Sequence, residues 1–151
     1  MLLHGQDKKL IKAISRYQET RNEPGIGARL ICTLAKFQHM FWTVISHSDI
    51  DRNARIHPTV RFPHLNGVVL HADAQVDENC MIMQQVTLGQ TAETGAPHVH
   101  AGAYIGAGAK VLGDISIGKN ARIGANAVVL ESVPDNATAV GVPARVTKVR
   151  N

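Results

Sequence analysis

A histidine, His64, lies where the regular pattern of apolar residues in this chain is interrupted. The apolar positions fall six residues apart from Ile50 to Phe62, and the pattern resumes at Leu70, eight positions after Phe62. An imidazole titrates near neutral pH, so a histidine presented by such a bulge can serve as a general base. From the residues alone, an exposed loop histidine without a chemical role is the simpler interpretation.

The surrounding six-residue repeat predicts a β-helix of stacked coils. An α-helix would repeat about every 3.6 residues and a single strand about every two. A unit of six residues cannot bury its own apolar face, so neighbouring coils must share one core. A smaller apolar residue follows most large ones by four positions. The large positions are Ile50, Ile56, Phe62, Leu70, Val76, Ile82, Leu88, Val99, Ile105, Val111, Ile117, Ile123 and Val129.

Composition agrees with a narrow aliphatic core and one repeat domain. The 151 residues are 44% apolar but only 4% aromatic, and the net charge is +4. Two cysteines, Cys32 and Cys80, do not make a disulfide framework, and Cys80 falls on a small inward position of the repeat. The positive charge suits an anionic cofactor. Nucleic-acid binding is not expected, because the chain has no basic helix, aromatic platform or recognition motif.

The N-terminal part predicts two helices, over residues 5–22 and 28–46, separated by the helix-breaking "NEPGIG". We expect a helical segment over 1–48 and the repeat domain, with a closing tail, over 49–151. The second helix is expected to cover the open edge of the first coil, and the alternative is a weak membrane-surface association. Charged residues within 26–46 argue against a bilayer span, and no secretory signal is evident, so a cytoplasmic protein is expected.

Four stretches, "SDIDRNARIHPTVRFPHLNGVVL", "QQVTLGQT", "IGAGAKVLGDISIGKNARIGANAVVLESVP" and "GVPARV", resemble the serine acetyltransferase branch of the hexapeptide-repeat acyltransferases. The resemblance covers roughly residues 48–147. It implies a mainly β fold, a left-handed parallel β-helix with three hexapeptides per coil. It also implies a homotrimer that binds acetyl-CoA in the groove between adjacent subunits. The periodicity alone establishes only stacked coils.

The resemblance assigns a role to the interruption. In the family this bulge carries the catalytic histidine, and an aspartate fifteen residues earlier pairs with it; the matching residues are His64 and Asp49. A neutral alcohol attacks a thioester poorly unless a base removes its proton. A carboxylate on the other ring nitrogen fixes the imidazole tautomer and stabilises the imidazolium. Stacked coils are expected to bring the two residues close together.

The resemblance also marks residues for the acyl donor and the acceptor. Ala107 and, fifteen residues on, Arg122 match the family's CoA contacts, although the family more often has lysine at the second position. Gly89 matches the place where the acetyl carbonyl approaches, and Arg145 and Lys148 in the tail are expected near the CoA phosphates. A long loop at 89–100 covers a neighbour's active site in the family. On this basis His98 is a candidate substrate contact, with solvent exposure as the alternative.

Departures from the serine branch bear on the acceptor. The family has an aspartate before the catalytic histidine, where this chain has Pro63, and an arginine and a histidine in the loop, where it has Gly95 and Ala96. An amino acid needs partners for both charges, because a buried unpaired charge is costly. The sequence therefore favours a sugar hydroxyl, as in the O-acetyltransferases of surface-polysaccharide pathways. Serine O-acetylation is the alternative.

Two other classes are remote alternatives. Some hexapeptide-repeat proteins are non-catalytic scaffolds. Others hold a metal with three histidines between subunits. His64, His71, His98 and His100 are the histidines available for such a site, but their spacing does not match the usual ligand sets. No metal is expected.

Overall fold

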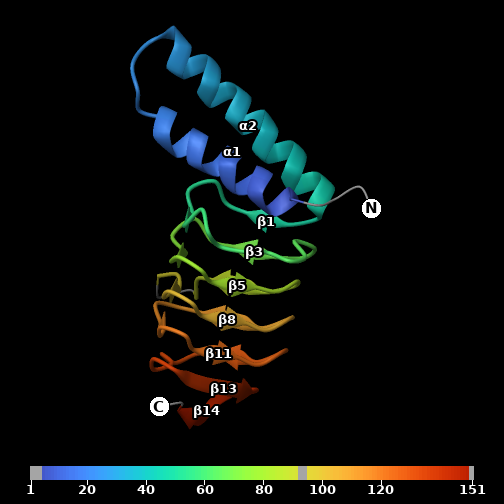
Figure 1. Cartoon of the computed structure of the whole chain (residues 1–151), viewed down its shortest axis with the longest axis vertical. Helices are drawn as coiled ribbons and strands as arrows, with labels where there is room; N and C mark the ends of the chain where they lie inside the picture. The colour runs from blue at the N-terminus through green and yellow to red at the C-terminus, as the bar shows by residue number, and fades with distance from the viewer. Residues whose placement is uncertain (1–4, 92–94, 150–151) are drawn as a thin grey trace.

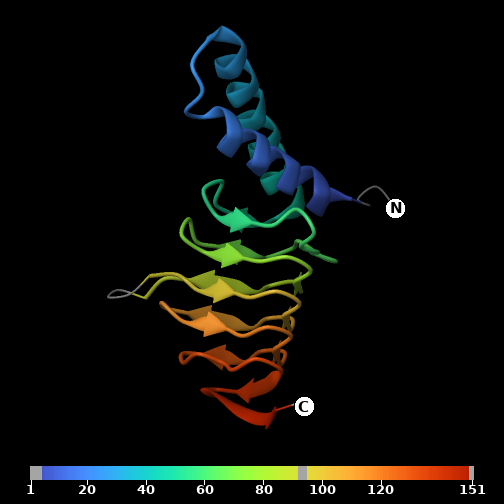
Figure 2. The same cartoon turned by 60° about the vertical axis from the view of Figure 1, so that its left-hand side comes forward.

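The chain folds into a parallel β-helix with two α-helices stacked on its N-terminal end (Figure 1). The structure, a computed structural model, describes residues 5–91 and 95–149. Helices α1 (Gln6–Thr20) and α2 (Ile26–Ser46) precede the first strand. The coils then follow one another in chain order away from the helices, as the turned view in Figure 2 also shows. This confirms the predicted fold class, a mainly β repeat fold with a short helical preface.

Short strands form three sheets, one along each face of the β-helix, which we call faces A, B and C. Face A contains β1 (Asp49–Ile50), β3 (Val69–Leu70), β6 (Thr87–Gly89), β9 (Lys110–Leu112) and β12 (Val128–Val129). Face B contains β2 (Arg55–Ile56), β4 (Gln75–Val76), β7 (His98–Val99) and β10 (Ser116–Ile117). Face C contains β5 (Met81–Ile82), β8 (Tyr104–Ile105), β11 (Arg122–Ile123), β13 (Ala137–Gly141) and β14 (Ala144–Val149). Strand β14 runs antiparallel to β13 and closes the C-terminal end.

The pairing of the strands shows how many residues each coil contains. Val69 pairs with Thr87 eighteen residues later, which is three hexapeptides. Asp49 pairs with Val69 after twenty residues, so the first coil holds two extra residues. Thr87 pairs with Lys110 after twenty-three residues, so a later coil holds five extra. Both interruptions of the sequence pattern are therefore real insertions into an otherwise regular helix.

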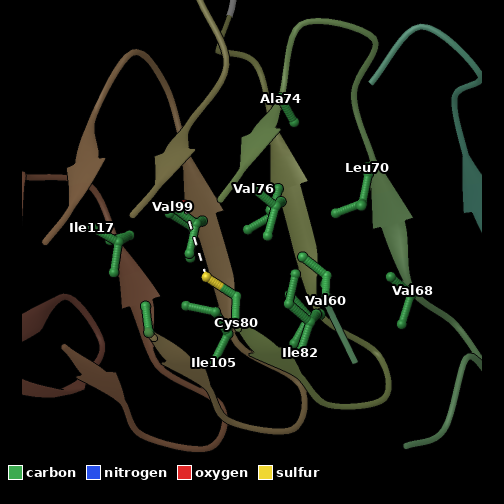
Figure 3. Packing of buried hydrophobic residues seen from close by; sticks show 14 of the residues in the cluster. Val60, Val68, Leu70, Ala74, Val76, Cys80, Ile82, Val99, Ile105 and Ile117 are labelled. Atoms are coloured by element: carbon green, nitrogen blue, oxygen red, sulfur yellow. Dashed lines mark hydrogen bonds between the residues drawn. The ribbon is translucent and has the colours of Figure 1, made fainter. Parts of the chain in front are cut away.

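The apolar repeat positions form the core, as predicted. All thirteen large positions are at most 9% exposed. Figure 3 shows part of this core, with Leu70, Val76, Ile82, Val99, Ile105 and Ile117 among the labelled residues. Cys80 is fully buried among them, and its thiol donates a hydrogen bond to the carbonyl of His100 at 3.1 Å. Burial is the main reason why the pKa of this thiol rises to about 11. The prediction that Cys80 is a core residue is confirmed.

Helix α1 provides most of the cover for the open edge of the first coil. Leu10, Ile11 and Ile14 of α1 are buried in the same core cluster as the coils. The Gln18 side-chain amide donates hydrogen bonds to the carbonyls of Arg52 and Ala54, both at 2.9 Å. The second helix contributes less than expected: Nε2 of His39 lies 2.8 Å from the carbonyl oxygen of Ile50, and the partly buried Trp42 packs against the core. The apolar face of α1 lies against the coil, and α2 packs mainly on α1.

Helix α2 presents a long apolar face to solvent. Its exposed apolar residues are Ile26, Leu30, Ile31, Leu34, Phe37, Met40, Phe41, Val44 and Ile45. Neither of the two helices in the described part of the chain is long and apolar enough to cross a membrane. The weak membrane-surface association of this helix stays a prediction.

Candidate active site

The bulge that carries His64 is anchored at both ends. Phe62 and Leu65 are only 3% and 5% exposed, so they hold the loop against the core while His64 stays exposed between them. The amide of Gly67 donates a hydrogen bond to the carbonyl of His47 at 2.7 Å, which ties the bulge to the end of α2. Gly67 adopts a φ of +67°, a conformation that glycine takes without strain. The fold therefore presents the His64 imidazole outward from a fixed corner.

His64 lines an open hollow between the helices and the first coil. The Asp7 carboxylate of α1 accepts a hydrogen bond from the Phe62 amide at 3.4 Å and forms part of the wall. A molecule in this hollow would touch the start of α1, the end of α2 and the bulge. Other lining residues include Ser46, His47, Arg61, Pro63 and Asn66.

Asp49 lies in a second, smaller hollow on face A. It is exposed at the start of β1, where its backbone amide donates to the carbonyl of Val68 at 2.8 Å. Gly89, at the end of β6, lines the same hollow, together with Asp51 and His71. The structure thus brings Asp49 and Gly89, two of the residues marked in the sequence, to one place.

Asp49 and His64 line different hollows and form no hydrogen bond or ion pair with each other in the described chain. The register gives the reason. Asp49 stands opposite Val69 on face A, whereas His64 lies five residues before Val69, at the corner that leads into that strand. The catalytic pairing of the two residues stays a prediction.

The backbone near Ala107 packs tightly against the next coil. A Cβ built on Gly106 would lie 2.7 Å from the amide nitrogen of Ala125, so no side chain can stand there. The Ala107 carbonyl accepts a hydrogen bond from the Asn126 amide at 2.8 Å, which fixes this corner to the next coil. Gly106 is buried and serves this packing, whereas the small Ala107 side chain beside it is partly exposed.

Basic residues gather on the outer side of face C near its C-terminal end. Arg122 pairs in register with Thr138, and Thr138 pairs with Lys148, so the three side chains share one row. The Arg122 guanidinium lies over the Tyr104 ring, 4.8 Å from its centroid. Arg145, on β14, is also exposed, and its Nη1 lies 3.8 Å from Oε1 of Glu131. These exposed cations suit a ligand with several phosphates.

His98 does not join either hollow. It lies on β7 of face B, where its Nε2 is 3.0 Å from Oδ1 of Asp77. His100 approaches the other oxygen of the same carboxylate, with Nδ1 3.2 Å from Oδ2. Burial raises the pKa of Asp77, but the hydrogen bonds and charges of His98 and His100 outweigh burial and lower it. Within one chain His98 is thus engaged with Asp77, and its contact with substrate stays a prediction.

This cluster of Asp77, His98 and His100 was not expected as a unit. The signal was present in the sequence. Two histidines separated by one inward valine must point outward together from a strand. Asp77 precedes His100 by twenty-three residues, the length of the expanded coil. The sequence pattern already contained that length, because Val99 follows Leu88 by eleven positions, five more than the repeat.

Comparison with known proteins connects this architecture to one group. The model of the bacterial transferase hexapeptide (six repeats) matches residues 96–131. The serine acetyltransferase of Haemophilus influenzae (strain ATCC 51907 / DSM 11121 / KW20 / Rd) is 46% identical over 101 residues, which are 65% of this chain and 38% of that protein. This chain therefore spans about two fifths of the length of that relative.

Solved structures give the same result over nearly the whole chain. A serine acetyltransferase in complex with CoA superposes with a TM-score of 0.72 at 40% identity, covering 89% of this chain and 55% of the other. The soybean serine acetyltransferase complexed with serine gives a TM-score of 0.81 at 35% identity, covering 97% and 59%. The repeat region of this chain is therefore a hexapeptide-repeat domain of the serine acetyltransferase type.

Proposed function

We propose that this chain is an acetyl-CoA-dependent O-acetyltransferase and that serine is the best-supported acceptor. The observation that carries the proposal is the 46% identity of the repeat region to a serine acetyltransferase. One similar structure is a complex with CoA and another is a complex with serine. These findings favour the alternative acceptor of the sequence analysis over the sugar that it preferred.

His64 acts as the general base in the proposed reaction. As the acceptor oxygen attacks the thioester carbonyl carbon, the imidazole takes the hydroxyl proton. The carbon–sulfur bond then breaks, and the imidazolium returns the proton to the leaving sulfur. The products are an acetyl ester and the free thiol of CoA. The exposed, anchored position of His64 supports this role, because substrate can reach the ring without a rearrangement of the core.

Asp49 holds the second ring nitrogen of His64 in the proposed active state. The carboxylate is exposed and makes no ion pair in the described chain, so it is available for this contact. Catalytic hydrogen bonds are often long or absent without substrate and tighten in the reacting complex. Gly89, in the hollow of Asp49, marks the position of the acetyl carbonyl, where a nearby backbone N–H stabilises the developing oxyanion.

The CoA moiety lies along the later coils in this proposal. The pantetheine arm lies against Ala107 in this proposal, because its small side chain is partly exposed beside the buried Gly106. Arg122, Lys148 and Arg145 then meet the phosphates, because they are the exposed cations at the C-terminal end of face C. The resemblance implies a homotrimer in which a neighbouring subunit closes this groove.

A sugar acceptor is the second candidate, and one observation favours it. Pro63, Gly95 and Ala96 stand where the serine branch is expected to have charged residues for the amino acid. In the described chain Gly95 lies near Asp114, whose carboxylate would repel the carboxylate of serine. A sugar hydroxyl is neutral and needs only hydrogen bonds.

The test is release of CoA thiol from acetyl-CoA with serine, and separately with a panel of hexoses and polysaccharide repeat units. Turnover of serine at sub-millimolar concentration supports the first candidate. Turnover of a sugar with none of serine supports the second. Absence of turnover with every acceptor, in protein that binds acetyl-CoA, would contradict the proposed activity.

A further inference from the structure

Face B carries a compact group of three ligand-type side chains, Asp77, His98 and His100. Val99 points into the core and is fully buried, so the residues on either side of it point outward from the same strand. Asp77 is in register with His100 on the neighbouring coil, because Val76 pairs with Val99. All three side chains are about one-third exposed, at 35%, 34% and 31%. A solute ion can therefore reach them.

Their donor atoms are spaced for one metal ion. The two Asp–His separations are 3.0 and 3.2 Å, and all three donor atoms lie within 4.8 Å of one another. A zinc ion bound at about 2.0–2.1 Å by nitrogen and oxygen ligands holds tetrahedral donors roughly 3.3 Å apart. Rotation of the two partly exposed imidazole rings would bring the remaining donor atoms to this separation without moving the backbone.

The electrostatics of the group also favour a divalent cation. The two imidazole rings are 4.0 Å apart between centroids and share one carboxylate. One divalent ion can bind a lone pair of each neutral ring and an oxygen of the Asp77 carboxylate. Two nitrogens and one carboxylate oxygen form a donor set suited to zinc.

The positions beside the group along face B are engaged in other contacts. Gly118 is in register with His100 on the next coil, because Val99 pairs with Ile117. Gly118 is buried, and a Cβ there would lie 2.4 Å from the amide nitrogen of Asp135. On the opposite side, beyond Asp77, the Nδ1 of His57 is bonded to the hydroxyl of Thr59 at 2.8 Å. Water can complete the coordination from the solvent side, because each of the three side chains is about one-third exposed.

We propose that Asp77, His98 and His100 form a binding site for a first-row divalent transition-metal ion, best suited to Zn²⁺. The site is separate from the hollows that contain His64 and Asp49. It joins β4 to β7, the strands on either side of the five-residue expansion. A metal here would add a further link between these two coils to their backbone pairing, shared core and Asp–His hydrogen bonds. The role is structural.

The test uses tag-free full-length protein freed of metal with a chelator. Zn²⁺ is titrated by calorimetry, and Co²⁺ is titrated by visible absorption, whose intensity reports tetrahedral coordination. We expect one ion per chain and a higher melting temperature with Zn²⁺. Three single variants, His98→Ala, His100→Ala and Asp77→Asn, should each weaken zinc binding by more than about tenfold. Even the loss of a residue that only supports a metal ligand typically lowers metal affinity by about that factor.

His71→Ala is the matched control. His71 is equally exposed, at 34%, and lies 3.7 Å from the carboxylate of Asp73, but no second histidine joins that pair. This variant should bind zinc as the wild type does. Circular dichroism of the metal-free variants separates loss of the site from loss of the fold. Absence of binding to folded wild-type protein, or equal loss in the His71 variant, would overturn the proposal.

Discussion

His64 and Asp49, fifteen residues apart in the chain, line two different hollows of the first coils. His64 lies under the helices, and Asp49 lies on face A beside Gly89. The bulge is fixed by the burial of Phe62 and Leu65, so the His64 backbone cannot easily follow its partner. Side-chain rotation of two exposed residues is the step that would join them in the reacting complex.

Replacement of His64 tests the proposed base. His64→Ala should lower kcat by about a hundredfold or more, the usual scale for loss of a general base. Affinity for CoA should remain near wild type, because the ring removes a proton and does not hold the cofactor. Steady-state kinetics and calorimetry with CoA measure the two effects. His57→Ala, another exposed histidine, serves as the control. Near-normal turnover of His64→Ala would rule out the assignment.

Replacement of Asp49 tests the pairing itself. Asp49→Asn keeps the size of the side chain but removes the charge that stabilises an imidazolium. We expect a smaller loss of kcat than for His64→Ala. We also expect no additional loss when both changes are combined, since residues that act as a unit are not additive. Independent, additive losses would show that Asp49 works apart from His64.

Arg122 and Lys148, the two basic residues in register through Thr138 on face C, should determine the affinity for acetyl-CoA. Arg122→Ala and Lys148→Ala each remove one charge from the row through Thr138. A charge-assisted contact contributes about 1.5–3 kcal/mol, so the KM for acetyl-CoA should rise at least roughly tenfold. The KM for the acceptor should change little. Arg55→Ala removes an exposed arginine from β2 on face B and is the matched control. Equal effects on both substrates would contradict the placement.

The fold was predictable from the sequence because its signal is periodic. The large apolar positions repeat so regularly that both insertions could be located before the register was known, and each reappears as an expanded coil. The helices were harder. Residues 26–46 carry the stronger apolar face, which suggested the coil-capping element. Yet α1 buries Leu10, Ile11 and Ile14 in the core of the coils, whereas α2 reaches the coil with His39 and the partly buried Trp42. Amphipathicity shows that a helix has an apolar side, but not which of two neighbours meets the coil.

The site was predictable only in part for a similar reason. Residues such as His64 and Gly89 could be marked from their place in the repeat. Contacts between side chains depend on which corner of a coil each residue occupies. The insertion before Val69 shifts His64 to the corner ahead of face A, so its distance from Asp49 does not follow from a fifteen-residue spacing. Asp77 and His100 likewise lie side by side because the expanded coil holds twenty-three residues.

The assembly proposed for the active site has a direct test. Each chain has a mass of 16.3 kDa, so a trimer is about 49 kDa, three times that value. Sedimentation equilibrium at assay concentrations should give this mass. A hexamer would leave the shared groove intact but would show that trimers also join, for which the exposed apolar face of α2 is available. A stable monomer with full activity would contradict an active site shared between subunits.

Cys80 provides a check on the coil core that does not depend on activity. It is fully buried, whereas Cys32 on α2 is partly exposed. In native protein at pH 8 a thiol reagent should therefore modify Cys32 and leave Cys80 intact, while both should react after denaturation.

Burial raises the Cys80 pKa from 9.0 to about 11, so the folded state keeps this proton over a pH range in which the unfolded chain loses it. The contribution of the Cys80 thiol to the free energy of unfolding is fully present below pH 9.0 and is lost as the pH rises towards about 11. Cys80→Ala should reduce this loss between pH 9.0 and about 11 in urea unfolding, and an unchanged pH profile, or rapid native labelling of Cys80, would contradict its buried position.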